Sequence, residues 1–166
     1  NIDHNLFGLP LTGNVGMQMV YTDQSSDGFS ARQIGPGVAE TVAVSGGAEY
    51  LEILPSSNFI LEVGDDMFAR FAVARTLARP RMDDMRASRT FSYNPTLADS
   101  DDINRSPWGG GGGNPELKPY IADVVDLSFE KYFANRRGYV SLAGFYKHLE
   151  SYVYSRNQIF DFSNYP

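Results

Sequence analysis

Residues 121–133 read Ile121-Ala-Asp-Val-Val-Asp-Leu-Ser-Phe-Glu-Lys-Tyr-Phe133 and carry the clearest period of two in the chain. The apolar residues Val125, Leu127 and Phe129 alternate with polar residues. An extended chain places such alternating side chains on opposite faces. The pattern predicts a β-strand with one apolar and one polar face, ending at the short turn 134–138.

Working outward, the same alternation predicts further strands. They are expected at Gly13–Thr22, Ala48–Val63, Phe68–Leu77 and Tyr139–Leu149, and residues 1–10 are expected to form a strand end and a short turn. A helix is the alternative prediction for Phe68–Leu77, because Ala and Arg favour helices. The adjacent turn and the β-rich neighbouring segments favour a strand. Because proline cannot donate to a ladder, Pro55 is expected to mark a bulge or break.

The connections between these strands alternate in length. Gly64-Asp-Asp66 predicts a tight hairpin, whereas residues 23–47, 78–120 and 150–166 are expected to be long loops, rich in Gly, Pro, Asp and Ser. Outer-membrane barrels keep short turns on one side and long loops on the other. We therefore expect an all-β fold of antiparallel strands that forms part of a large transmembrane β-barrel. A soluble sheet with one wet face produces the same alternation, so periodicity alone leaves both open.

Composition excludes several classes of function. The net charge is −6 and the basic residues are dispersed, which argues against nucleic-acid binding. The chain has no Cys and no apolar run long enough for a spanning helix. Aromatic residues near the predicted strand ends are expected to form parts of the interfacial girdles. They are Tyr132, Phe133, Tyr139, Tyr152 and Tyr154.

Motifs for catalysis or metal binding are weak. The glycine run 109–113 has no following Gly-Lys-Ser/Thr, residues 99–102 do not fit a calcium loop, and His4 and His148 lack ligand spacing. No Gly-x-Ser-x-Gly occurs. We expect no enzyme activity, no metal and no cofactor.

Two groups of residues are candidates for ligand contact. The predicted rim, at the end of the strand 68–77 and in the following loop, combines guanidinium groups, carboxylates and aromatic rings, which suit a polar ligand such as a sugar or a chelate. Its candidates are Arg79, Arg81, Asp83, Asp84, Arg86, Tyr93 and Trp108. The alternative for the charged members is a solvated rim with weak ion pairs.

The second group lies on the polar faces of two strands. In a barrel this face looks into the lumen while Val125, Leu127 and Phe129 meet lipid. The residues expected to face the lumen are Arg70, Asp126, Ser128 and Glu130.

The order of several segments resembles one family. Phe71-Ala-Val-Ala-Arg-Thr-Leu-Ala-Arg-Pro80, Gly113-Asn-Pro-Glu-Leu-Lys-Pro119, Asp126-Leu-Ser-Phe-Glu-Lys-Tyr132 and Phe145-Tyr-Lys147 are similar to the barrel region of TonB-dependent outer-membrane receptors. The resemblance covers about residues 13–154 and includes Leu54-Pro55-Ser56. The segment 79–85 is similar to proteobacterial receptors associated with oligosaccharide uptake, and siderophore receptors share much of the pattern.

The resemblance implies a function. It implies a receptor in the bacterial outer membrane that takes up a scarce nutrient such as an oligosaccharide or siderophore and that contacts lipid and, when intact, the TonB energy-transducing complex. We expect residues 1–166 to be one partial barrel domain of about five strands, without the plug domain and the closing strands. The alternatives are a secreted or periplasmic β-rich carbohydrate-binding module and a hydrolase on a β scaffold.

Overall fold

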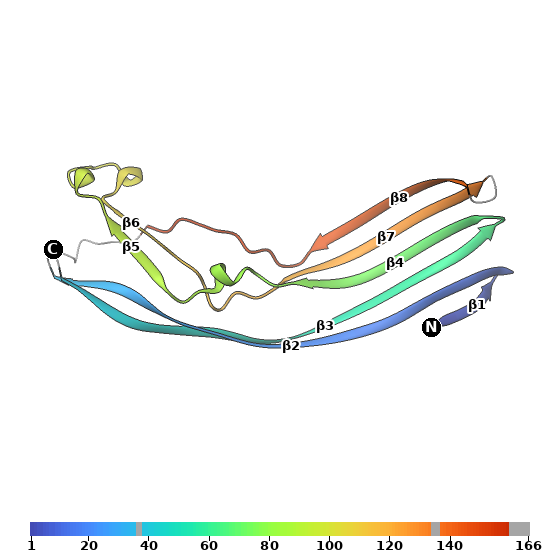
Figure 1. The fold of residues 1–166 in the computed structure, drawn as a ribbon, viewed down its shortest axis with the longest axis horizontal. Coiled ribbons are helices and arrows are strands. Elements are labelled where there is room, and N and C mark those ends of the chain that lie inside the picture. Colours follow the sequence, from blue (N-terminus) through green and yellow to red (C-terminus); the bar gives the residue numbers. More distant parts are fainter. Residues whose placement is uncertain (36–37, 134–136, 160–166) are drawn as a thin grey trace. The chain divides into compact units, whose positions relative to one another are not determined.

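A computed structural model describes residues 1–35, 38–133 and 137–159, and these are almost entirely β-structure (Figure 1). The chain order is β1 (Ile2–Leu6), β2 (Leu9–Gly35), β3 (Val38–Gly64), β4 (Met67–Ala78), β5 (Arg89–Tyr93), β6 (Trp108–Gly112), β7 (Tyr120–Phe133) and β8 (Gly138–Leu149). Three 3₁₀ turns, η1 (Met82–Met85), η2 (Pro95–Leu97) and η3 (Ile103–Arg105), lie between β4 and β6. The all-β prediction is confirmed.

One sheet contains the eight strands of the described part of the chain. Its order is β6-β5-β2-β3-β4-β7-β8, and β1 pairs with β2. The five predicted strands correspond to β2, β3, β4, β7 and β8; the sheet also contains β1, β5 and β6. The contacts between residues divide the chain into two units.

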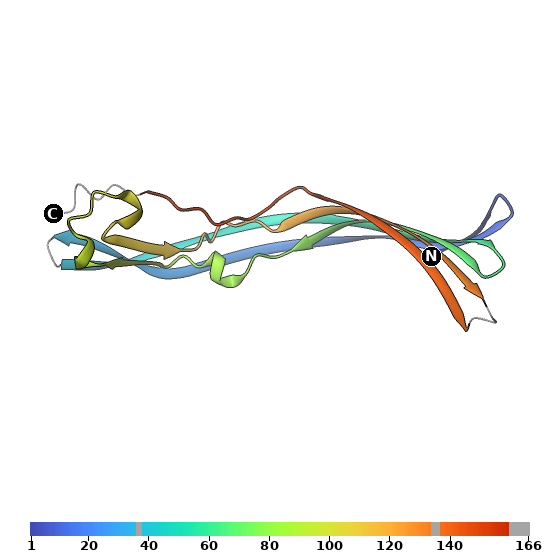
Figure 2. The same ribbon diagram turned by 90° about the horizontal axis from the view of Figure 1, so that it is seen from above.

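The first unit comprises Asn1–Tyr21, Leu51–Arg79 and Pro119–Tyr152. Here β4, β7 and β8 lie side by side (Figures 1 and 2). The β4–β7 ladder runs without interruption from Met67↔Lys131 to Ala78↔Tyr120. Its regularity confirms the strand prediction for 68–77 over the helical alternative, because both strands carry the period-two pattern that a ladder requires.

Alternation gives this unit two chemically different faces. Phe71 pairs with Leu127 and Val73 with Val125 on one face. Leu127 is 59% exposed and Leu142, on the neighbouring strand, 76% exposed. Large apolar side chains are therefore exposed on this face of the sheet.

Short turns join the strands of the first unit. Asp65–Asp66 closes the predicted hairpin between β3 and β4, with Asp66 at φ 57°. Phe7–Gly8 closes a similar hairpin between β1 and β2, as predicted for residues 1–10. Of the predicted turn 134–138, residues 134–136 lie outside the described part, and Phe133↔Gly138 is the closing pair of the β7–β8 ladder.

β3 itself continues through Pro55. Its ladder with β4 begins only at the next residue, Ser56, opposite Ala74, so the expected break is found in this ladder and not in the strand. The irregularity in this ladder lies between Glu62 and Gly64, next to the turn.

The second unit comprises Thr22–Tyr50, Pro80–Lys118 and the described residues after Tyr152. The predicted loop at 23–47 is wrong, because β2 continues to Gly35 and β3 begins at Val38. The polar residues Asp23, Ser25 and Asp27 are exposed, whereas those between them are half-buried. Residues 23–28 are polar on both faces of β2, so they show no hydrophobic alternation, and their Asp, Ser and Gly residues favoured the prediction of a loop.

The predicted long loop 78–120 is also more ordered than expected. It contains the hairpin β5–β6, paired from Arg89↔Gly112 to Tyr93↔Trp108, and the three 3₁₀ turns. A parallel bridge between Ser30 and Arg89 attaches β5 to β2. We call residues 79–119 the connection below.

Candidate ligand-binding site

The β5–β6 hairpin brings together the two aromatic residues predicted for ligand contact. Tyr93 and Trp108 are directly opposite each other, with ring centroids 4.7 Å apart and an interplanar angle of 49°. Tyr93 is 50% exposed and Trp108 is partly exposed. Paired rings of this kind offer an apolar surface to a flat or ring-shaped ligand.

Glycine makes one strand of the hairpin nearly bare. Arg89, Phe91 and Tyr93 alternate on β5, and Gly112 and Gly110 stand opposite the first two. A Cβ at Gly110 would lie 2.6 Å from the Thr90 carbonyl oxygen and 3.0 Å from the Phe91 ring. The glycine run therefore permits close packing of β5 side chains, which is a structural role.

The charged candidates gather around η1, apart from the aromatic pair in the sequence of the connection. Arg81 precedes η1 and pairs with Asp83 at 3.9 Å, with both side chains about four-fifths exposed. Asp84 has a backbone role, because its carbonyl accepts the Asn114 N–H at 2.7 Å. Arg79 and Arg86 are exposed on either side. An exposed pair at this distance contributes little to stability.

Sequence reasoning missed the residues that hold the connection. Gln24 donates from Nε2 to the Pro115 and Leu117 carbonyls at 3.0 and 2.8 Å. The Ala87 N–H donates to Ser26 Oγ at 3.0 Å. Both side chains belong to the part of β2 that was expected to be a loop, so the pattern gave no reason to pair them with anything.

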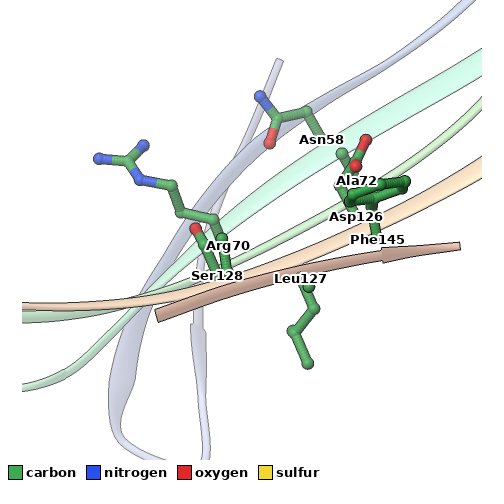
Figure 3. A pocket seen from close by; sticks show the side chains of 9 residues that line it. Asn58, Arg70, Ala72, Asp126, Leu127, Ser128 and Phe145 are labelled. Carbon is green, nitrogen blue, oxygen red and sulfur yellow. The ribbon is translucent and has the colours of Figure 1, made fainter. Parts of the chain in front are cut away.

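In the first unit, the predicted lumen-facing residues share one face. Arg70 lies opposite Ser128 and Ala72 opposite Asp126, and Figure 3 shows Arg70 and Ser128 on one side of the sheet with Leu127 on the other. Arg70 forms a forked pair with Glu130, Nε to Oε1 at 3.0 Å and Nη2 to Oε2 at 3.3 Å. Two-point contact of this kind fixes the orientation of both side chains.

Aromatic rings continue this face toward the β7–β8 turn. Tyr132 donates to Glu130 Oε2 at 3.2 Å. Its ring meets Phe68 edge-on at 6.0 Å and stacks on Tyr139 at 5.7 Å. Arg70, Glu130 and these rings thus form a connected polar and aromatic wall.

A shallow hollow occupies the centre of the same face (Figure 3). Small residues form its floor because Ala72 and Ala143 flank Asp126 and Ser128 in the neighbouring strands. Asn58 and Phe145, which sequence reasoning missed, complete its edge. Their polar-face register could have been read from alternation, had the pairing of the strands been known.

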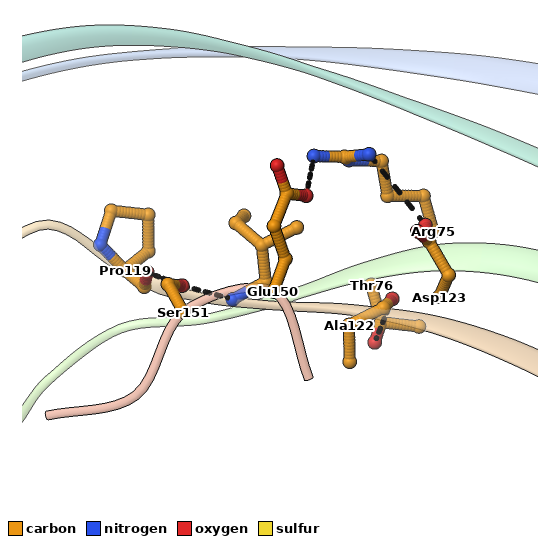
Figure 4. Close-up of polar contacts among 8 residues, drawn as sticks. Arg75, Thr76, Pro119, Ala122, Asp123, Glu150 and Ser151 are labelled. Atoms are coloured by element: carbon orange, nitrogen blue, oxygen red, sulfur yellow. Dashed lines mark hydrogen bonds and ion pairs between the residues drawn. The ribbon is translucent and has the colours of Figure 1, made fainter. Parts of the chain in front are cut away.

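On the apolar face, a charged group follows the pair Val73↔Val125. Arg75 lies opposite Asp123, one position before Thr76↔Ala122, and pairs with Asp123 at 3.6 Å and with Glu150 (Figure 4). Ser151 Oγ donates to the Pro119 carbonyl at 2.8 Å and accepts the Ile121 N–H at 2.9 Å, so a side chain completes the β7 edge beyond β8. These contacts involve Glu150 and Ser151, which directly follow the end of β8 at Leu149.

In the described residues, no group of three or more His, Asp or Glu side chains is placed to hold a metal ion. Asp102 instead caps η3 by accepting the Asn104 N–H at 2.9 Å. Within the same part of the chain, no helix has the length and apolar character needed to cross a membrane.

Comparison with known proteins identifies the family. The family model described as TonB dependent receptor-like, beta-barrel matches residues 4–166. No curated protein and no solved structure matches the chain. The family is one of outer-membrane transport proteins rather than enzymes, and its barrels sit in the outer membrane. A match over almost the whole chain, together with a sheet that has one polar and one apolar face, shows that this chain belongs to the TonB-dependent receptor-like β-barrel family.

Proposed function

We propose that this chain forms part of a receptor wall that takes up a scarce nutrient, such as an oligosaccharide or a siderophore, across the outer membrane. The observation that carries the proposal is the Tyr93–Trp108 pair at 4.7 Å, held on a hairpin of the connection. Exposed, rigid aromatic pairs bind rings without losing much side-chain entropy. The connection is thus the proposed site of first contact, with Arg79, Arg81, Asp83, Asp84 and Arg86 supplying polar contacts.

The residues expected to face the lumen have a second role in this proposal. Arg70, Asp126, Ser128 and Glu130 would line the path of the ligand on the lumen side, whereas Val125, Leu127 and Phe129 would contact lipid. The arrangement follows from the cost of exposing charges to hydrocarbon, which drives polar side chains to the interior of a barrel. Energy for passage would come from the TonB complex in the intact receptor.

The alternative of a secreted carbohydrate-binding module requires a second layer over the apolar face. Leu127, Leu142 and Tyr146 are each more than half exposed, which favours a lipid-facing role instead. Binding of carbohydrate by the hairpin is common to both readings. Only the surroundings of the apolar face separate them.

Trp108 is the sole tryptophan, so its fluorescence reports on the proposed contact site alone. The chain refolded in detergent micelles is titrated with maltohexaose and, separately, with ferrichrome as a hydroxamate siderophore. The proposal expects a saturable change in Trp108 emission with one class of probe and its loss in Tyr93→Ala. A titration that is flat for both, repeated with oligosaccharides of other linkages and other chelates, counts against ligand contact by this hairpin.

A further inference from the structure

One face of β2 in the second unit contacts two segments of the connection. We call these segments the limbs: one precedes β5 and the other follows β6. Gln24, Ser26, Gly28 and Ser30 follow one another at every second position and are half-buried. Residues at this spacing point to the same side of a strand. The face is therefore a docking surface for the chain itself, and its amide, hydroxyl and glycine residues suit backbone contact.

Gln24 holds the limb that follows β6. This limb turns at 114–117, where Glu116 N–H donates to Asn114 Oδ1 at 3.0 Å and Leu117 N–H to the Asn114 carbonyl at 3.3 Å. The Pro115 and Leu117 carbonyls receive their hydrogen bonds from Gln24 Nε2. A side-chain amide has two N–H donors, and Gln24 thus uses both.

Ser26 and its neighbours hold the limb that precedes β5. Ser26 Oγ accepts a hydrogen bond from the Ala87 N–H, and the backbone of Ser30 pairs with that of Arg89 in a parallel β-bridge. A Cβ on Gly28 would approach the Ser88 backbone nitrogen to 2.9 Å, so only glycine allows the limb to lie this close. The order of contacts along β2 matches the order of residues 87–89.

The two limbs are also joined to each other. Asn114 N–H donates to the Asp84 carbonyl at 2.7 Å. A Cβ on Gly113 would lie 2.5 Å from that same carbonyl oxygen and 2.7 Å from the Arg86 carbonyl oxygen. Because Gly113 directly follows β6, this junction forms the root of the β5–β6 hairpin.

We propose that Gln24 is the positioning residue that fixes the β5–β6 hairpin, so that Tyr93 and Trp108 are presented in one arrangement. It acts through residues 113–117 and does not touch the ligand. This inference rests on the proposed function for the meaning of the positioning, but the clamp itself is testable without any ligand. Its energetic basis is that two backbone carbonyls lose their donor when the amide is removed.

The test compares three variants of the full chain in detergent micelles. Gln24→Glu places a carboxylate against two carbonyl oxygens, whereas Gln24→Ala removes the donor without adding a charge. Gln18→Glu is the matched control, because Gln18 is exposed on the same strand. Amide hydrogen exchange is followed by mass spectrometry, together with acrylamide quenching of Trp108.

In both Gln24 variants, exchange at residues 84–89 and 108–118 is expected to accelerate about tenfold, and quenching to rise, with residues 67–78 unchanged. Exchange no faster than in Gln18→Glu would overturn the proposal. An equal acceleration in β4 and β7 would also overturn it, because it would show general destabilisation.

A ligand titration separates positioning from a purely structural role. With whichever probe changes Trp108 emission, Gln24→Glu is expected to raise the Kd several-fold while keeping the change at saturation, since the rings remain. If local exchange accelerates but no probe binds the unaltered chain, the clamp stands and the proposed function fails. If the probe binds and Kd is unaltered by Gln24→Glu, the positioning role fails and the proposed function stands.

Discussion

Tyr93 and Trp108 face each other across the end of the β5–β6 ladder, with ring centroids 4.7 Å apart and planes inclined by 49°. We expect Tyr93→Ala to increase acrylamide quenching of Trp108, because the neighbouring ring shields one side of the indole. Tyr93→Phe is expected to retain the shielding, since it keeps the ring. Equal quenching in the alanine variant and the unaltered chain would show that the pair is not formed in solution.

Gly113 and Gly111 provide a matched pair within one glycine run. A Cβ on Gly113 would meet backbone atoms of Asp84 and Arg86 within 2.8 Å, whereas a Cβ on Gly111 would meet nothing within 4 Å. We expect Gly113→Ala to accelerate amide exchange at Asn114 and Gly111→Ala to leave it unchanged. The same exchange rate in both variants would mean that the hairpin root is not packed as described.

The turn between β1 and β2 holds a bulky residue in a left-handed conformation. Phe7 has φ 51° and is 97% exposed, and Gly8 has φ 83°. Asn followed by Gly is favoured in two-residue hairpin turns, so Phe7→Asn is expected to raise the free energy of unfolding by about 1 kcal/mol. Urea unfolding in micelles measures this, with Phe7→Ala as the control that keeps the strain. A loss of stability in both variants would instead show that the Phe7 ring is an anchor at the membrane interface.

Tyr50 buries a hydroxyl group without a hydrogen-bond partner among the described residues. The residue is 8% exposed. Removing an unsatisfied buried group avoids a desolvation penalty, so Tyr50→Phe is expected to be neutral or to stabilise by about 1 kcal/mol. Tyr21→Phe is the control, because Tyr21 is 64% exposed. A marked loss of stability in Tyr50→Phe alone would reveal a partner for the hydroxyl, such as a bound water.

The strands of the first unit could be predicted because their two faces differ in chemistry. The alternation of Val125, Leu127 and Phe129 with polar residues predicts which face each side chain lies on, without knowledge of the partner strand. Residues 68–77 carry the complementary pattern. The same rule fails for residues 23–28, where Asp, Gln, Ser and Gly occupy both faces of the strand. A pattern based on hydrophobicity contains no signal for a strand that lies outside an apolar environment.

The candidate site was predicted only in part, for a related reason. Residue type and position at the predicted rim placed Tyr93 and Trp108 in one group of candidates, and the hairpin register makes them a direct pair. Gln24 and Ser26 were missed because their partners are backbone groups more than sixty residues away. Such contacts depend on topology and leave no local pattern.

The central claim is that the two faces of β7 and β8 meet different surroundings, lipid on one side and the lumen on the other. Leu127 and Phe145 allow a direct comparison, because both are large, apolar and exposed in the chain, at 59% and 82%, yet lie on opposite faces. The free energy of unfolding is measured in phospholipid vesicles for Leu127→Arg and Phe145→Arg. The account predicts a loss of about 2–4 kcal/mol for Leu127→Arg if it lies near the bilayer midplane, and less than about 1 kcal/mol for Phe145→Arg, which enters the polar face beside Asp126. Equal losses, or a larger loss at Phe145, would contradict it.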